Sequence, residues 1–157
     1  MSSTPETQVR RRVAYRSIND IRNDLHPLIS QPTFTVGQWS FGQILEHLTK
    51  TTNASFDGFG FKAPWWARTF IAPFIKRRFL TKPMPAGFTL PKSAAIITPA
   101  DRVEISAAVD EFIWALQRLE RDIPRAEHPF FGPMKPEEWL QLHLRHAELH
   151  LSFVVPE

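Results

Sequence analysis

Four segments of this 157-residue chain carry apolar residues at the three- and four-residue spacing of an amphipathic helix, and none shows sustained polar–apolar alternation. This pattern predicts an all-α fold with helices at residues 17–29, 40–57, 98–122 and 136–154. The second and third of these helices are joined by residues 61–97, and a chain that returns along a bundle needs a connection of this length. The sequence therefore predicts a four-helix bundle with one long crossover between helices 2 and 3.

Capping signals mark where these helices begin. Ser17 and Ser40 each stand where a side-chain oxygen can accept a hydrogen bond from the first turn. Thr98 is expected to cap the third helix in the same way, and Pro136 suits the first position of the fourth. Pro27 predicts that the first helix ends or kinks at the residue before it.

Length and composition favour one cytoplasmic domain over residues 1–157, with residues 1–16 as a flexible or loosely packed segment. The chain has no cysteine, which excludes disulfides and thiolate ligands and leaves only nitrogen and oxygen donors for any metal. No apolar run resembles a signal peptide or reaches the length of a membrane span.

The net charge of +3 is modest, and basic clusters occur at residues 10–12 and 76–78. No stripe of basic residues follows a predicted helix, so we expect a solvated surface and no nucleic-acid interface.

Residues 61–80 combine aromatic and basic side chains, which is typical either of a membrane interface or of a lid over the bundle. The lid is favoured because a long crossover must bury its apolar side chains against the bundle, so membrane association is not expected. The aromatic content also allows a homodimer.

The fourth predicted helix places His143, His146 and His150 on one face, within an arc of about 60°. Histidines on an inward face are usually hydrogen-bonded core residues, but His146 and His150 have the spacing that chelates a metal. His143 and His146 could also form a pair, whereas His143 and His150 are about 10.5 Å apart along the axis, too far to share one ion. His47 on the second helix is the leading third ligand, and the spacing leaves both pairs open.

Other polar residues carry weaker signals. Asp57 lies further along the second predicted helix and could line a pocket. Glu46 and Glu148 each adjoin a candidate ligand and are expected to face solvent. His26 and His128 precede prolines and are interpreted as surface or packing residues. No nucleophile, base and acid stand in a recognisable arrangement, so the catalytic residues are unknown.

Two segments, residues 37–48 and 145–153, together resemble the DinB-like superfamily of metal-dependent helical bundle proteins. Further segments look like a subgroup catalogued only as a domain of unknown function: residues 57–59, 84–87, 128–132 and 136–139. The resemblance implies a four-helix bundle that binds a divalent ion, nickel or zinc, through His47, His146 and His150. It leaves His143 as a pocket residue or as one that supports the ligands.

The resemblance also suggests an activity. Some relatives are thiol-dependent S-transferases or isomerases, although they continue after the last histidine with a segment that this chain lacks. The favoured hypothesis is a metal-dependent enzyme, S-transferase-like or hydrolase-like, that acts on a small molecule with the help of a low-molecular-weight thiol. Trp39, His143 and the crossover aromatics would shape an apolar pocket. The alternative is a non-catalytic binding or stress-response module with a structural or vestigial metal site.

Overall fold

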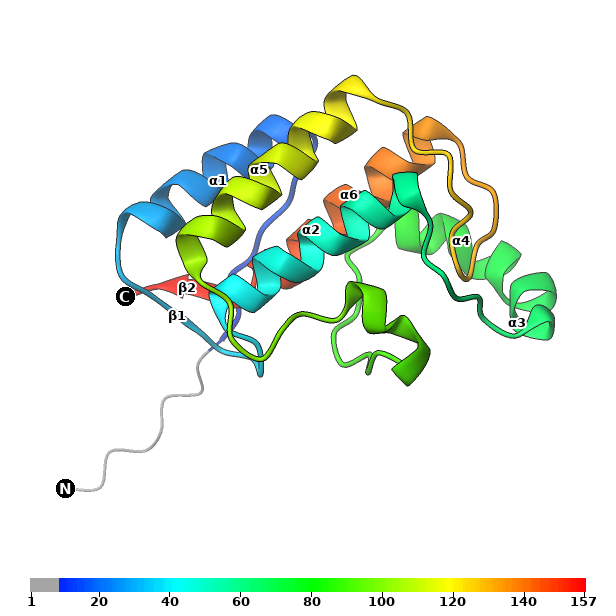
Figure 1. Ribbon diagram of the computed structural model, residues 1–157, viewed down its shortest axis with the longest axis horizontal. Coiled ribbons are helices and arrows are strands. Elements are labelled where there is room, and N and C mark those ends of the chain that lie inside the picture. Colours follow the sequence, from blue (N-terminus) through cyan, green and yellow to red (C-terminus); the bar gives the residue numbers. More distant parts are fainter. Residues whose placement is uncertain (1–8) are drawn as a thin grey trace.

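The computed structural model describes residues 9–157 and is mostly helical, which confirms the predicted all-α class (Figure 1). The helices are α1 (Ile18–Ser30), α2 (Phe41–Asp57), α3 (Trp65–Phe70), α4 (Ala72–Thr81), the 3-10 helix η1 (Lys92–Ile97), α5 (Ile105–Arg121) and α6 (Pro136–Leu151). The strands are β1 (Thr33–Thr35) and β2 (Val154–Pro156).

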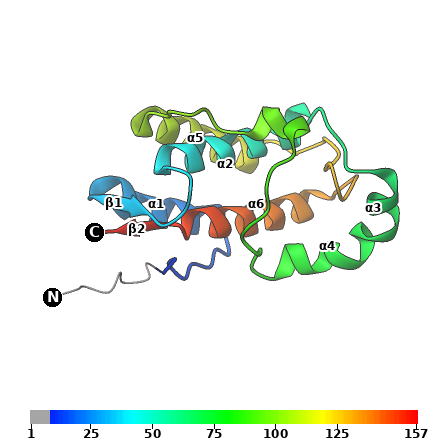
Figure 2. The ribbon, with the colours of Figure 1, turned by 90° about the horizontal axis from the view of Figure 1, so that it is seen from below.

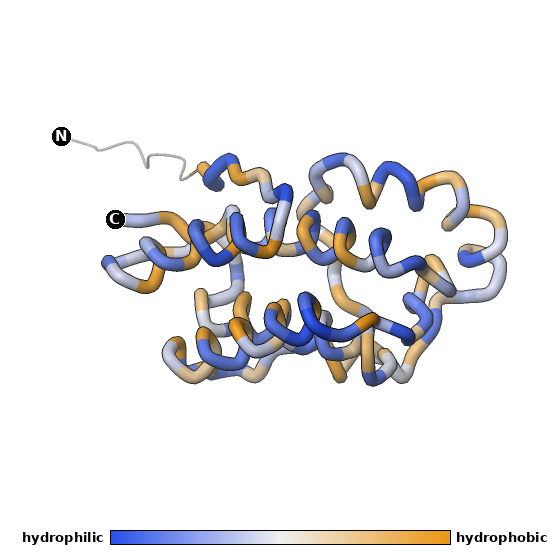
Figure 3. The backbone as a smooth tube through the Cα atoms, turned by 90° about the horizontal axis from the view of Figure 1, so that it is seen from above, coloured by the Kyte–Doolittle hydropathy of each residue, from blue (hydrophilic) through white to orange (hydrophobic). Residues whose placement is uncertain are grey.

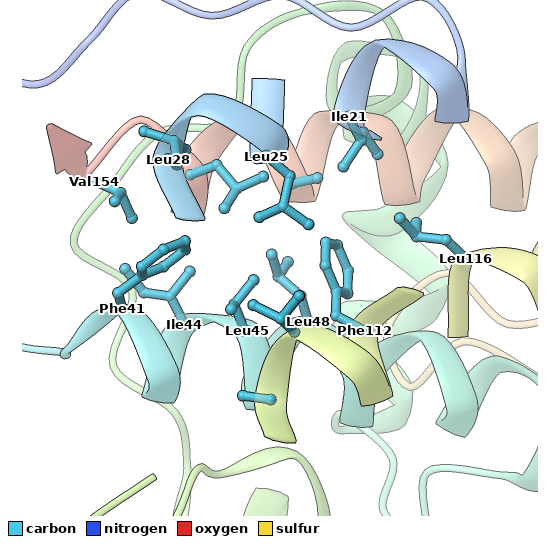
Figure 4. Packing of buried hydrophobic residues seen from close by; sticks show 14 of the residues in the cluster. Ile21, Leu25, Leu28, Phe41, Ile44, Leu45, Leu48, Phe112, Leu116 and Val154 are labelled. Atoms are coloured by element: carbon cyan, nitrogen blue, oxygen red, sulfur yellow. The ribbon is translucent and has the colours of Figure 1, made fainter. Parts of the chain in front are cut away.

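Helices α1, α2, α5 and α6 pack around one apolar core, to which each contributes the inward stripe of its sequence (Figure 4). Helices α2 and α5 lie in one layer, and α1 and α6 lie in the other (Figure 2). The large side chains that are almost fully buried in this core include Ile21, Leu28, Ile44, Leu45, Phe112, Leu116, Leu144 and Leu151. The core therefore aligns α2 beside α6, the two helices that carry the predicted ligands.

The predicted caps of the first two helices are confirmed. The Ser17 hydroxyl accepts from the backbone of Asp20, and the Ser40 hydroxyl accepts from the backbone of Gln43. Helix α1 does not end before Pro27, the first of the two predicted alternatives, because it continues to Ser30. Pro27 lies on the exposed side of α1, where water can satisfy the carbonyl that loses its amide partner.

Helix α5 begins at Ile105, seven residues after the predicted cap at Thr98. The Glu104 carboxylate caps it by accepting from the backbone amides of Ser106 and Ala107. The preceding residues are held in a non-helical conformation by α2, because the Glu46 carboxylate accepts from the Ala100 amide at 2.7 Å. The long-range contact with α2 thus overrides the local capping signal.

The last helix is also shorter at its C-terminal end than predicted. Helix α6 ends at Leu151, and Val154–Pro156 pairs antiparallel with Thr33–Thr35, which lies between the first two predicted helices. Val154 is fully buried in the core, which draws the chain out of the helical path. Three-residue strands are too short to show a measurable alternation of polarity, so the sequence pattern missed this pairing.

The predicted flexible segment, residues 1–16, lies partly outside the described residues. Of the remainder, Arg11 and Tyr15 are packed against the core helices rather than loose. Arg11 forms a bidentate ion pair with Asp24 on α1, with both N···O distances at 2.8 Å. The Tyr15 ring is buried, and its hydroxyl donates to the same carboxylate at 2.6 Å.

Glu148 on α6 is buried, so the prediction that it faces solvent is wrong. Its carboxylate accepts from the Tyr15 amide at 2.6 Å and pairs with Arg145 at 2.7 Å. The N-terminal segment crosses α6 at this point and covers the carboxylate. The position of Glu148 two residues before His150 therefore did not predict the exposure of its side chain, because the N-terminal segment buries it.

The crossover forms two short helices, α3 and α4, which meet at Ile71, and Pro73 lies in the first turn of α4. Helix α4 contacts α6 and buries Ala72 and Leu80 against the molecule. The prediction of a lid is wrong for the aromatic side chains of α3 and early α4, which are exposed to solvent. Among residues 9–157, no helix is both long enough and apolar enough to cross a membrane.

Candidate metal centre

Helices α2 and α6 bring His47, His146 and His150 together. These three residues are called the His cluster below. The Nε2 atom of His146 lies 3.2 Å from that of His47 and 3.0 Å from that of His150. The ligand atoms of all three lie within 4.8 Å of one another, and no other group of this kind occurs in the described part of the chain. The structure therefore contains a three-histidine group that could hold a metal ion.

Hydrogen bonds on the far side of two rings determine which nitrogen carries the proton. His47 Nδ1 lies 2.6 Å from the carbonyl oxygen of Ile97, which can only accept, so Nδ1 is the protonated nitrogen. His146 Nδ1 lies 3.4 Å from the Thr51 hydroxyl, whose own proton is donated to backbone carbonyls of α2. The hydroxyl therefore accepts from His146 Nδ1. Both Nε2 atoms are left as lone-pair acceptors that face each other.

Burial keeps these imidazoles neutral. Loss of hydration lowers the pKa of His47 to about 4 and that of His150 to about 3. The pKa of His146 is lowered well below its ordinary value, first by burial and then by the neighbouring histidines. Neutral imidazole is the form that binds metal ions, so the cluster need not lose protons to bind one at neutral pH.

The cluster fits a divalent ion. Ligand distances of about 2.0–2.1 Å in a tetrahedral zinc site place neighbouring nitrogens about 3.3 Å apart. The observed 3.0 and 3.2 Å are close to this spacing. Opposed lone pairs at such distances repel each other unless a cation lies between them. An all-imidazole donor set suits zinc, nickel, copper or iron.

A wide cleft of about 1110 Å³ opens beside the His cluster. Trp39 forms its wall nearest the ligands, with its ring centroid 4.8 Å from that of His47 and stacked 5.6 Å from that of His150. Further apolar lining comes from α2, α6, the C-terminal extension of α6 and the crossover, and includes Ile44, Leu149, Phe153, Phe79, Met84, Phe88 and Leu90. Lys92 is the charged residue of the described lining, and no acidic side chain of residues 9–157 lines the cleft.

His143 is placed apart from the cleft. Its Nε2 lies 3.1 Å from the Ser55 hydroxyl, and it lines a small cavity of about 10 Å³ together with His146. Burial lowers the pKa of His143 to about 4, so this side chain is neutral as well. His143 is thus a buried, hydrogen-bonded neighbour of the cluster. It lies about one turn before His146 on α6 and is not one of the grouped ligands.

Asp57 does not line the cleft, and the prediction that it does is wrong. It lies ten residues after His47, which is about 15 Å along a helix. Its exposed carboxylate forms an ion pair with Arg118 of α5, at 2.6 Å. The neighbouring helix therefore holds Asp57 on the surface.

His128 has a packing role, as predicted. Its Nδ1 accepts from the backbone amides of Phe130 and Phe131, and its ring stacks on that of Phe131. Burial lowers the pKa of His128 to about 3.

The sequence reasoning missed both groups that orient the ligands. Thr51 could have been found, because it stands four residues after His47 on the same helix face. The carbonyl of Ile97 could not, because every residue has one.

Comparison with known proteins identifies the family. A family described as a protein of unknown function (DUF1569) matches residues 7–157. The chain belongs to this family. No curated protein and no solved structure matches the chain. For a DUF1569 protein, the geometry of the His cluster is therefore the main guide to function.

Proposed function

We propose that this DUF1569 protein is a DinB-like, metal-dependent enzyme built on a four-helix bundle, with its substrate in the cleft beside the His cluster. The observation that carries the proposal is the convergence of three neutral imidazoles at that cleft, two of them with their lone pairs fixed by hydrogen bonds. The shared core of α1, α2, α5 and α6, with its long connection between α2 and α5, supports the bundle assignment.

The open geometry favours a reactive site over a structural one. Structural zinc sites are closed by four protein ligands, whereas catalytic sites keep one position for water or substrate. The cluster offers three ligands, and no fourth is grouped with them among residues 9–157. His146 and His150 are partly exposed and line the cleft, so the remaining position faces the space where a small molecule can bind.

The residues around the cluster define what the site can do. A zinc or nickel ion, when bound, would supply a Lewis acid that lowers the pKa of a thiol or another nucleophile in its open position. The Ile97 carbonyl and the Thr51 hydroxyl hold two ligand rings in place. The apolar lining, including Trp39, excludes water and favours an apolar substrate. The proposed reaction is the transfer or addition of a small thiol or other nucleophile to such a molecule in the cytoplasm.

Metal analysis of the untagged protein tests the site directly. We expect about one divalent ion per chain, held by three protein ligands. His146→Ala and His150→Ala should each lose it, whereas His26→Ala, on the exposed side of α1, should retain it as the matched control. A wild-type protein that carries no stoichiometric metal after gentle purification, and takes up neither zinc nor nickel on addition, refutes the proposal.

The alternative is a non-catalytic bundle in which the metal only stabilises the fold. The absence of an acidic side chain from the described lining of the cleft favours it, because no carboxylate is available there as a general base. Cobalt substitution separates the two functions. A visible spectrum that changes on addition of a small thiol supports the enzyme. A lower melting temperature on metal removal, with no exchange of ligands at the cobalt, supports the structural role.

A further inference from the structure

Five apolar side chains of the crossover remain uncovered, although a lid would have buried them. These residues, called the α3–α4 face below, are Trp65, Trp66, Phe70, Ile71 and Phe74. Phe74 is 83% exposed and Trp65 is 70% exposed. The face lies at the end of the molecule opposite the C-terminus and strand β2 (Figures 1 and 2). Clustered apolar exposure of this kind marks an interaction surface rather than a scatter of single residues.

The segment around this face has an unusual charge. Residues 58–100 contain seven of the chain's 19 basic residues and none of its 16 acidic residues. Two acidic residues from elsewhere, Glu127 and Glu138, pair with Lys62, Arg68 and Lys76. Within residues 9–157, no ion pair holds the exposed side chains of Arg77, Arg78 and Lys82. A net positive charge therefore remains next to the apolar side chains.

Helix geometry places the apolar and basic groups side by side. Arg77 and Arg78 follow Phe74 by three and four residues on α4, so the three side chains share one face of the helix. In Figure 3, hydrophobic and hydrophilic residues are interspersed along α3 and α4, and α4 contacts α6. The exposed side chains of the two helices combine aromatic rings with guanidinium groups, which is the composition of an interfacial helix.

We propose that the α3–α4 face binds the surface of a lipid bilayer that contains anionic headgroups. Tryptophan and phenylalanine rings are stable at the level of the headgroups, and the free arginines are attracted to the negative surface. This reverses the expectation from sequence, because the structure leaves the aromatic residues uncovered.

Two other occupants fit the face less well. A two-fold dimer through this face would bring the same net positive charge from both copies into one interface, where like charges repel. A nucleic acid would use the basic residues but would leave Ile71 and Phe74 without an apolar partner. The bilayer surface offers anionic headgroups to the arginines and an apolar interior to the exposed aromatic side chains.

Vesicle flotation with the full chain tests the proposal. We expect binding to vesicles of phosphatidylcholine with about a third phosphatidylglycerol, and little binding to phosphatidylcholine alone. The double variant Arg77→Gln, Arg78→Gln should lower the partition coefficient roughly 30-fold, since each basic residue near an anionic surface contributes about fivefold. Phe74→Ala should lower it about tenfold through lost apolar burial. Trp114→Ala is the matched control, because Trp114 is 74% exposed on α5 and should not affect binding.

Several results overturn the proposal. The first is a failure of the wild-type protein to float with anionic vesicles. Equal flotation of the Phe74→Ala and wild-type proteins has the same consequence. The second is binding to a DNA duplex that is as tight as vesicle binding and unaffected by Phe74→Ala, which identifies a polyanion site. The third is a dimer in analytical ultracentrifugation that Phe74→Ala dissociates, which identifies self-association. Circular dichroism and the melting temperature verify that each variant is folded, and substitutions at these exposed positions should leave both unchanged.

Discussion

Acidification of the metal-free protein to pH 5 should remove most of its stability. Burial lowers the pKa of His47 and His143 to about 4, and that of His128 and His150 to about 3, from 6.5 in the unfolded chain. The unfolded chain therefore takes up protons in a pH range where the folded chain does not. The stability due to these neutral histidines is fully present above pH 6.5 and is lost as the pH falls toward 4.

The size of the loss follows from proton linkage. At pH 5 each of these four side chains is almost fully protonated in the unfolded chain and almost unprotonated in the folded chain. Each then lowers the free energy of unfolding by about 2 kcal/mol between pH 6.5 and pH 5, at about 1.4 kcal/mol per pH unit. Four such residues remove about 8 kcal/mol, which is comparable to the total stability of a domain, about 5–15 kcal/mol.

Urea unfolding followed by circular dichroism, at pH 7, 6 and 5 in the presence of a chelator, measures this loss. We expect a slope near pH 5 of at least about 5 kcal/mol per pH unit, because His146, whose pKa is also lowered by burial, adds to the other four histidines. His143→Gln should reduce the slope by about 1.4 kcal/mol per pH unit. His26→Gln, an exposed residue of α1, should keep the wild-type slope. A wild-type slope that corresponds to one proton or fewer would show that these histidines are not buried and neutral in the folded protein.

Three further predictions concern single side chains. Glu148→Gln should lower the free energy of unfolding by about 3 kcal/mol in urea titrations, because it leaves the half-buried Arg145 guanidinium without its counter-charge; an unchanged midpoint would contradict this. Gly42→Ala should cost about 1–3 kcal/mol. A Cβ at position 42 would lie 2.5 Å from the carbonyl oxygen of Val103, and thermal melting measures the effect. Thr51→Val should weaken zinc binding about 10- to 100-fold in calorimetric titration, because it removes the acceptor that orients one ligand ring; equal affinity would refute that role.

Much of the helical framework could be predicted because its signals are local. The inward stripe of Ile18, Ile21, Leu25 and Leu28 predicted α1, and the structure buries all four. The Ser40 cap likewise placed the start of α2 correctly, since a cap depends only on residues within the first turn.

The errors arose where distant segments compete with local preference. Thr98 has a good capping sequence, but the Glu46 carboxylate holds the next residues away from a helical path. Glu148 was predicted to be exposed to solvent, but the N-terminal segment covers it in the folded chain. Asp57 looked like a pocket residue until Arg118 of α5 paired with it at the surface. None of these partners is close in sequence, so the periodicity of one segment carries no information about them.

The all-α class and the chelating spacing of His146 and His150 follow from local sequence, because helical periodicity repeats every three to four residues. The resemblance to a known superfamily added His47, which spacing alone had left as a candidate. The orientation of the ligand rings depends on tertiary contacts, namely the packing of α2 against α6 and the hydrogen bond from His47 to the carbonyl of Ile97. It also left the α3–α4 face uncovered. Both outcomes depend on contacts between segments far apart in the chain, and such contacts exist only once the core has formed.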